Sequence, residues 1–176
     1  MTGWYDAQEL GRRFVKDESN LVCAIVSSPL RRAIQTSLAA FPRILNSALS
    51  PEDGGQAVNL VLDANLQEIS DYPANTGSSL SKLVNEFPEI VPQIQHLDPK
   101  WYIKSGSNSP LPDLKTVILE ELNRISESLR TTYEPDIIVV THQGVISLLA
   151  PSVDILMGQW HTFRLSRNGG GQLVLR

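Results

Sequence analysis

Two uninterrupted apolar runs constrain the fold of this sequence more than any other feature. Leu21–Val26 and Asp136–Thr141 consist almost entirely of aliphatic and β-branched residues, and segments with helical spacing surround both. A strand that is covered on both faces reads as a continuous apolar run, whereas a strand with one face in water alternates apolar with polar residues. The two runs therefore predict central strands of a mostly parallel sheet with helices on both faces, a three-layer α/β fold.

Apolar residues recur at helical spacing before the first run and before the second. Residues 6–17 predict a helix that has Asp6 as its cap and Leu10 and Phe14 on one face. Residues 113–130 predict a longer helix with one apolar face. The residues on that face are Leu114, Val117, Ile118, Leu122, Ile125 and Leu129.

The remaining segments complete a single domain over residues 1–176. Residues 70–112 are rich in Ser, Pro, Asn and Asp, and they predict a lid-like insertion with only short helical pieces. No repeat, low-complexity tract or linker divides the chain. The other expected elements are a polar loop at 46–56, a strand at Val58–Leu62, helical pieces near 79–87 and 88–96, and a terminal hairpin of Trp160–Ser166 and Gln172–Leu175.

Charge and composition argue against two classes of partner. The 176 residues carry a net charge of −4, and no run of Lys and Arg is long enough to indicate binding to nucleic acid or to an anionic membrane. The apolar stretches are far shorter than the roughly twenty residues of a membrane-spanning helix. The first residues lack the pattern of a secretory signal, and the single cysteine, Cys23, reads as a buried apolar residue. We therefore expect a cytoplasmic protein.

The first candidate for a functional segment lies where the first apolar run ends. Ser27-Ser28-Pro29 leads into a helix, with Pro29 in its first turn, and Arg31 and Arg32 follow after Leu30. The first N–H groups of a helix and its dipole favour an anion, and a guanidinium adds a planar fork suited to phosphate or carboxylate. The alternative from the residues alone is an ordinary capped helix with solvated arginines.

The second candidate lies where the other apolar run ends. His142 follows the strand directly, and residues 144–150 predict a short helix after it. Open α/β folds place their ligands at this carboxyl edge of the sheet, where an imidazole acts as an acid, a base or an anion-binding cation. A structural histidine with satisfied hydrogen bonds is the alternative.

Taken together, Ser-Ser-Pro-Leu-Arg-Arg-Ala-Ile-Gln-Thr at 27–36 and Thr-His-Gln-Gly at 141–144 resemble the histidine phosphatase, or phosphoglycerate mutase-like, superfamily. The resemblance implies that Arg32 binds the phosphate and that His142 is a catalytic histidine. The segment at 66–70 resembles the one that supplies the acid/base carboxylate, which makes Glu68 the second catalytic candidate. Ser28 and Gln143 are further anion-binding candidates, although Gln143 replaces the small residue usual in the family. No metal or cofactor is expected, and the segment at 71–77 resembles fungal members.

One feature of that superfamily is missing from this sequence. Its members open with a strand that ends in Arg-His-Gly, whose histidine becomes phosphorylated, and no Arg-His pair occurs among the 176 residues. We therefore expect the first strand of the fold to be missing and little or no phosphatase activity, as in a pseudoenzyme. The gap in the sheet would be closed by direct pairing of its neighbours, by the C-terminal strand, or by a second copy in a homodimer.

Three functions are compatible with these features. The chain is a phosphatase relative that still binds a small anionic metabolite, or an enzyme of other chemistry, or a catalytically inactive interaction module. In the second case Glu68 and His142 would be the acid and base of an isomerase or cyclase acting on a carbonyl metabolite of fungal biosynthesis. The other histidines, His96 and His161, do not form a metal site by spacing, and His96 is expected at the surface.

Overall fold

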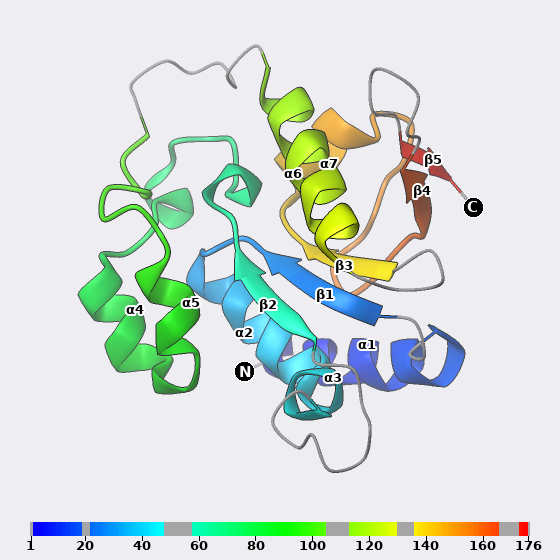
Figure 1. The fold of residues 1–176 in the computed structure, drawn as a ribbon, viewed down its shortest axis with the longest axis horizontal. Coiled ribbons are helices and arrows are strands. Elements are labelled where there is room, and N and C mark those ends of the chain that lie inside the picture. Colours follow the sequence, from blue (N-terminus) through cyan, green and yellow to red (C-terminus); the bar gives the residue numbers. More distant parts are fainter. Residues whose placement is uncertain are drawn as a thin grey trace.

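The computed structural model describes residues 2–18, 22–47, 58–104, 113–129, 136–165 and 173–175. The described strands form a parallel three-stranded sheet in the order β2-β1-β3 and an antiparallel pair of β4 and β5 (Figure 1). Their bounds are Val22–Ser27 for β1, Asn59–Leu62 for β2, Asp136–Val140 for β3, Phe163–Leu165 for β4 and Leu173–Leu175 for β5. The parallel sheet among helices confirms the predicted α/β class.

β1 is the central strand of the parallel sheet, as predicted. All its residues are buried, and Ile25 lies opposite Leu60 of β2 on one side and opposite Ile138 of β3 on the other. Ile25 packs into the core on one face of the sheet, whereas Ala24 and Val26 pack into the core on the opposite face. Because both faces are covered, every position of the strand is apolar or small.

The prediction that the second apolar run is also a central strand is wrong for the described sheet. β3 pairs with β1 along one edge, no other described strand pairs with it, and its residues are only half-buried. The run is apolar because both faces of the strand are covered. Ile138 and Val140 pack against the core on one face, and Ile137 and Val139 pack against the core on the other. Two covered faces make a strand apolar whether one or both of its edges are paired.

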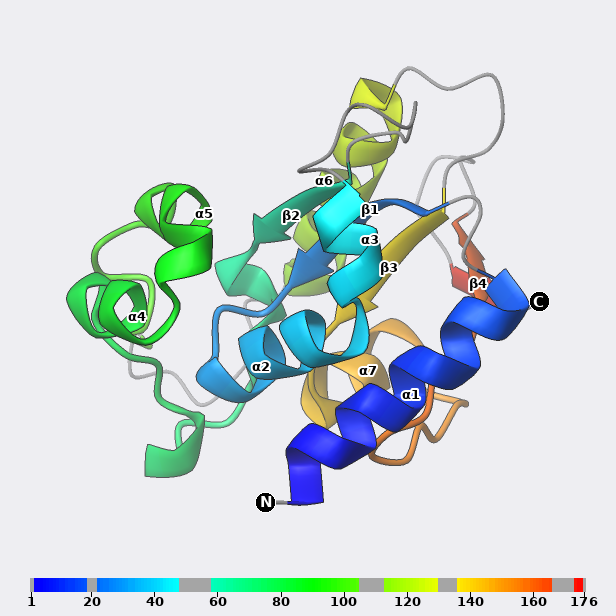
Figure 2. The same ribbon diagram turned by 90° about the horizontal axis from the view of Figure 1, so that it is seen from below.

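Helices cover both faces of the parallel sheet (Figure 1). The helices on one face are α1 (Thr2–Glu18), α2 (Arg31–Ala40) and α3 (Pro42–Ser47), and those on the other are α6 (Leu114–Ser128) and α7 (Gln143–Leu149). α1 and α2 lie side by side (Figure 2), so close that a Cβ on Gly11 would lie 1.9 Å from the carbonyl oxygen of Ala40. Leu10 and Phe14 of α1 are buried in the core, as predicted.

Two predicted helix starts need correction. α1 begins at Thr2, so Asp6 lies inside the helix and is not its cap. α2 begins at Arg31 with Leu30 as the cap residue, so Pro29 precedes the helix instead of occupying its first turn. The Leu30 N–H donates to Ser28 Oγ at 3.3 Å, and this bond closes a bend before the helix begins.

The apolar face of α6 is rotated slightly from the predicted one. Ile118, Leu122 and Ile125 are buried as expected, but Leu119 is 2% exposed and Val117 is 37% exposed. Buried residues at i, i+1, i+4 and i+7 define one helical stripe, and the position before the first of them turns towards solvent. Spacing alone did not decide which of two neighbouring apolar residues faces inward.

The described part of the insertion packs against the core. Its helices are α4 (Leu80–Glu86), α5 (Val91–Gln95) and 3-10 helices at Pro73–Asn75 and Pro88–Ile90, in agreement with the predicted short helical pieces. Leu83, Ile94 and Trp101 are buried in the same core as α1 and α2. A further 3-10 helix, Ala64–Leu66, links β2 to the insertion.

The predicted terminal hairpin is present in part. β4 and β5 pair antiparallel, with Arg164 opposite Val174, and the turn around Asn168–Gly171 lies outside the described residues. The predicted polar loop at 46–56 also lies mostly outside them, although its first two residues end α3. Within the described ranges, no helix combines the length and the apolar character that crossing a membrane requires.

Candidate functional site

The ends of β1 and β3 bring the two predicted motifs together. The strands run parallel, with Ser27 opposite Val140, and the Ser28 N–H donates to the Val140 carbonyl at 2.9 Å. The segments that follow the two strands therefore leave the sheet at the same end, that of the strands' C-termini. The segment after β1 leads into α2, and the segment after β3 leads into α7. His142 is the residue immediately before α7 and is 8% exposed.

Three of the predicted residues contact one another at this edge. Arg32 Nε lies 3.3 Å from His142 Nδ1, and His142 Nε2 lies 2.9 Å from Ser28 Oγ. Because a guanidinium only donates, Nδ1 accepts, and the proton of the neutral imidazole is on Nε2 and is donated to Ser28. Ser28 is fully buried and also accepts the Leu30 N–H, so this arrangement does not make it an activated nucleophile.

His142 is uncharged at neutral pH. Burial lowers the pKa of His142 most, and the nearby charges of Arg32 and Lys104 lower it further, from 6.5 to about 4. The positive charge of the cluster therefore comes from Arg32 and Lys104. His142 contributes a neutral imidazole whose Nδ1 lone pair faces Arg32.

Glu68 lies beside the start of α7. Its Oε1 accepts the Ile69 N–H at 2.8 Å, and a Cβ on Gly144 would lie 2.2 Å from the same oxygen. The carboxylate therefore occupies the space that a side chain at residue 144 would take. Thr141 Oγ1 donates to the Leu66 carbonyl at 2.8 Å and ties the Glu68 segment to the end of β3.

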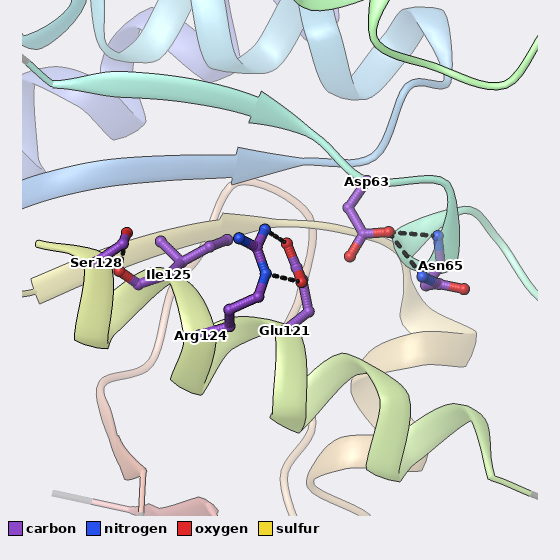
Figure 3. Close-up of polar contacts among 6 residues, drawn as sticks. All are labelled: Asp63, Asn65, Glu121, Arg124, Ile125 and Ser128. Carbon is purple, nitrogen blue, oxygen red and sulfur yellow. Dashed lines mark hydrogen bonds and ion pairs between the residues drawn. The ribbon is translucent and has the colours of Figure 1, made fainter.

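Asp63 shapes the turn that leads to Glu68. Its Oδ1 accepts the backbone N–H of Asn65 at 2.8 Å and the Asn65 side-chain amide at 2.9 Å (Figure 3). Burial raises the pKa of Asp63, the Asn65 hydrogen bonds lower it, and the charge of Glu121 on α6 raises it slightly. The turn is thus fixed by an acceptor that is costly to bury in its charged form.

Lys104 belongs to the cluster although sequence reasoning missed it. Its ammonium donates to the Glu68 carbonyl at 2.6 Å and, at a shorter distance, to the Ser70 carbonyl. Burial lowers the pKa of Lys104 most, the charges of Glu68 and Asp71 raise it, and that of Arg32 lowers it. A lone lysine near the end of a polar insertion carries no sequence signal for this position.

Asn75 and Ala74 were also missed. Arg32 Nη1 donates to the Ala74 carbonyl at 2.9 Å, and Nη2 donates to Asn75 Oδ1 at 2.8 Å. The Asn75 amide in turn donates to Ser70 Oγ at 2.6 Å. A 3-10 turn of the insertion therefore contacts the two terminal nitrogens of the guanidinium, whereas His142 contacts Nε.

Gln143, Cys23 and the other histidines lie apart from these contacts. The Gln143 side chain is exposed and its amide donates to Asp154 Oδ1 at 3.4 Å. His96 is exposed, as predicted, and so is His161. Cys23 is buried, as predicted, and burial followed by the charge of Asp136 raises its pKa. Among the described residues, no group of His, Cys, Asp and Glu is placed to hold a metal ion.

An open polar cleft of about 390 Å³ lies nearby but is separate from the cluster. It is lined by Arg31, Ser78, Lys82, Asn85 and Glu86. Arg31 and Glu86 form an ion pair there, with Nε and Oε2 2.5 Å apart. The charge of Arg31 is therefore balanced within the cleft, unlike that of Arg32, whose partners are neutral.

Comparison with protein families identifies the superfamily of this chain. The family model of the histidine phosphatase superfamily (branch 1) matches residues 1–170, nearly the whole chain. Neither the curated proteins nor the solved structures include a significant match.

Proposed function

The chain belongs to the histidine phosphatase superfamily, branch 1, and from this premise we propose that it binds a small anionic metabolite through Arg32. We also propose that these 176 residues have little or no phosphatase activity. The single observation that carries the binding proposal is the environment of Arg32. Its guanidinium is exposed and has only neutral hydrogen-bond partners among the described residues: an imidazole, a carbonyl and an amide.

Electrostatics at the sheet edge support anion binding. An arginine without a carboxylate partner keeps its charge available for a ligand, and charge-assisted hydrogen bonds from a guanidinium are the stronger kind. Lys104 adds a second positive charge close enough to lower the pKa of His142, and the nearby carboxylates of Glu68 and Asp71 offset part of it, so Arg32 carries the proposal. The N-terminus of α2 adds a favourable dipole, because Arg32 lies in the first turn of that helix.

We expect low phosphatase activity because no residue matches the nucleophilic histidine of the superfamily. The 176 residues contain no Arg-His pair. The Nδ1 lone pair of His142 accepts from Arg32 and its Nε2 proton goes to Ser28, so neither nitrogen is placed to attack a phosphoryl group without rearrangement. Binding and electrostatic stabilisation alone leave an enzyme several orders of magnitude below its full rate.

Calorimetric titration with inorganic phosphate and vanadate tests the binding proposal. We expect saturable binding that Arg32→Ala weakens at least tenfold, the effect of losing one charged hydrogen bond or more. Arg31→Ala is the matched control, because Arg31 is the neighbouring residue of the same helix turn but pairs with Glu86. Equal loss in both variants, or no binding by the wild type, would contradict the proposal.

Turnover of p-nitrophenyl phosphate tests the second part. We expect no release above that of the buffer control, at any pH between 4 and 8. Release that disappears in His142→Ala, together with a phosphorylated histidine detected by mass spectrometry, would show that His142 is a nucleophile after all. That result would reject the proposed absence of phosphatase activity while leaving the anion site intact.

A second candidate function is proton transfer on a carbonyl metabolite. The observation that favours it is the Glu68 carboxylate beside Gly144 at the start of α7, two residues after the neutral imidazole of His142. In such a reaction Arg32 would hold the carboxylate or enolate oxygen, Glu68 as the base would remove a proton from a substrate carbon, and His142 as the acid would return a proton to another substrate atom. Deuterium uptake from D₂O into small keto acids, followed by NMR, tests it. Uptake should be lost in Glu68→Gln, and an equal rate in that variant would exclude this role.

A further inference from the structure

We propose that Asn75 is a positioning residue of the anion site, which holds the Arg32 guanidinium in the orientation that a ligand meets. This inference rests on the proposed anion-binding function and specifies the class of ligand. Asn75 lies 43 residues from Arg32 in the chain and reaches it only through the fold.

The hydrogen bonds of Arg32 show how much of the guanidinium is left for a ligand. A guanidinium has five N–H groups. Within the described part of the chain, three have partners: Nε donates to His142, one N–H of Nη1 to Ala74 and one N–H of Nη2 to Asn75. One N–H on each terminal nitrogen therefore remains. Both are charged donors, which suit an oxyanion such as a carboxylate or a phosphoryl group.

Asn75 is itself held in one orientation. Its oxygen faces a group that only donates, so its NH₂ must face the other way, where it donates to Ser70 Oγ. The carbonyl of Ser70 accepts from Lys104. A chain of contacts therefore links Arg32 through Asn75 to Ser70, and Ser70 is held by Lys104, which also binds the Glu68 carbonyl.

Apolar packing does not fix this turn in place. No residue of the 3-10 helix Pro73–Asn75 is buried, and Tyr72 before it is 70% exposed. The nearest packed point is Gly77, where a Cβ would lie 2.2 Å from the ring of Trp101. The hydrogen bonds to Arg32 therefore set the position of the turn and, reciprocally, the direction of the guanidinium. Ala74 contributes a backbone carbonyl, so Asn75 is the partner that a substitution can remove.

The position of Arg32 has a consequence at His142 that does not depend on any ligand. The positive charge of Arg32 is one cause of the lowered His142 pKa, together with burial and Lys104. If Asn75 holds Arg32 against the imidazole, its removal lets the guanidinium move towards solvent. The pKa of His142 then rises, whereas a turn with a purely structural role would leave it unchanged.

Asn75→Ala and Asn75→Asp, each with the full chain, test the proposal. The first readout is the pKa of His142 from an NMR titration, which we expect to rise in Asn75→Ala. The second is the affinity for inorganic phosphate, which should fall about tenfold in Asn75→Ala. It should fall further in Asn75→Asp, because the new carboxylate pairs with Arg32 and competes with the ligand. Asn85→Ala, on α4 and outside the cluster, is the control for both readouts.

The outcomes separate this inference from the proposed function. A folded Asn75→Ala variant with an unchanged His142 pKa and an unchanged phosphate affinity would overturn the positioning role. A wild type that does not bind phosphate would reject the anion site. In that case a raised His142 pKa in Asn75→Ala would still support the role of Asn75. A double-mutant cycle with Arg32→Lys completes the test: a loss of affinity from Asn75→Ala that is the same in both backgrounds would show that Asn75 does not act through Arg32.

Discussion

The buried imidazole of His142 makes the stability of this fold depend on pH, and His142→Gln tests the effect. In the folded chain the pKa of His142 is lowered from 6.5 to about 4, first by burial and then by Arg32 and Lys104. Between these two pH values the unfolded chain binds a proton that the folded chain does not. The stabilisation is therefore fully present above pH 6.5 and is lost progressively as the pH falls to about 4.

The size of the effect follows from the shift. One pKa unit corresponds to about 1.36 kcal/mol, so the whole shift corresponds to about 3.4 kcal/mol. Arg32 is exposed, and water and salt screen its share of the shift, which reduces our expectation to about 2 kcal/mol. The wild type should therefore lose about 2 kcal/mol more than His142→Gln in free energy of unfolding between pH 7 and pH 4.

Urea unfolding at several pH values measures this difference. The substitution also removes the partner of Ser28 and Arg32, so the change with pH is informative and the absolute stability at one pH is not. His96→Gln is the matched control, because His96 is exposed and its loss should leave the pH dependence unchanged. Parallel curves for the wild type and His142→Gln would refute the reasoning, and so would an NMR titration that gives His142 a pKa near 6.5.

Four further outcomes are expected. Gly11→Ala should cost more than about 2 kcal/mol in urea unfolding, because the added carbon would lie 1.9 Å from the backbone oxygen of Ala40, which cannot move alone. Gly144→Ala should cost only about 1 kcal/mol, since it meets the end of the flexible Glu68 side chain, and the cost should vanish in Glu68→Ala. Asp63→Asn should keep or raise the melting temperature at pH 7, because burial opposes the charge of Asp63, and a clear decrease would contradict this. We also propose that the chain forms a homodimer by complementing a sheet edge, and light scattering that shows a monomer at micromolar concentration would reject the dimer.

The sequence determined the local elements and the two motifs that meet at the sheet edge. The apolar run predicted a covered strand, which the structure shows as β1 (Val22–Ser27), and the parallel direction of β1 and β3 then brought Ser28 and His142 to the same end of the sheet. The contact of Arg32 with His142 follows from the same geometry, with the resemblance to a family indicating which arginine to choose.

Only the tertiary structure decided what surrounds that edge. The place of β3 in the strand order depends on pairing between distant segments, and an apolar run reports covered faces but not paired edges. Asn75 and Lys104 reach Arg32 and Glu68 from an insertion without periodicity, through hydrogen bonds that no local pattern encodes. Even the protonation of His142 is a tertiary property, because burial and two cations brought from other segments set it.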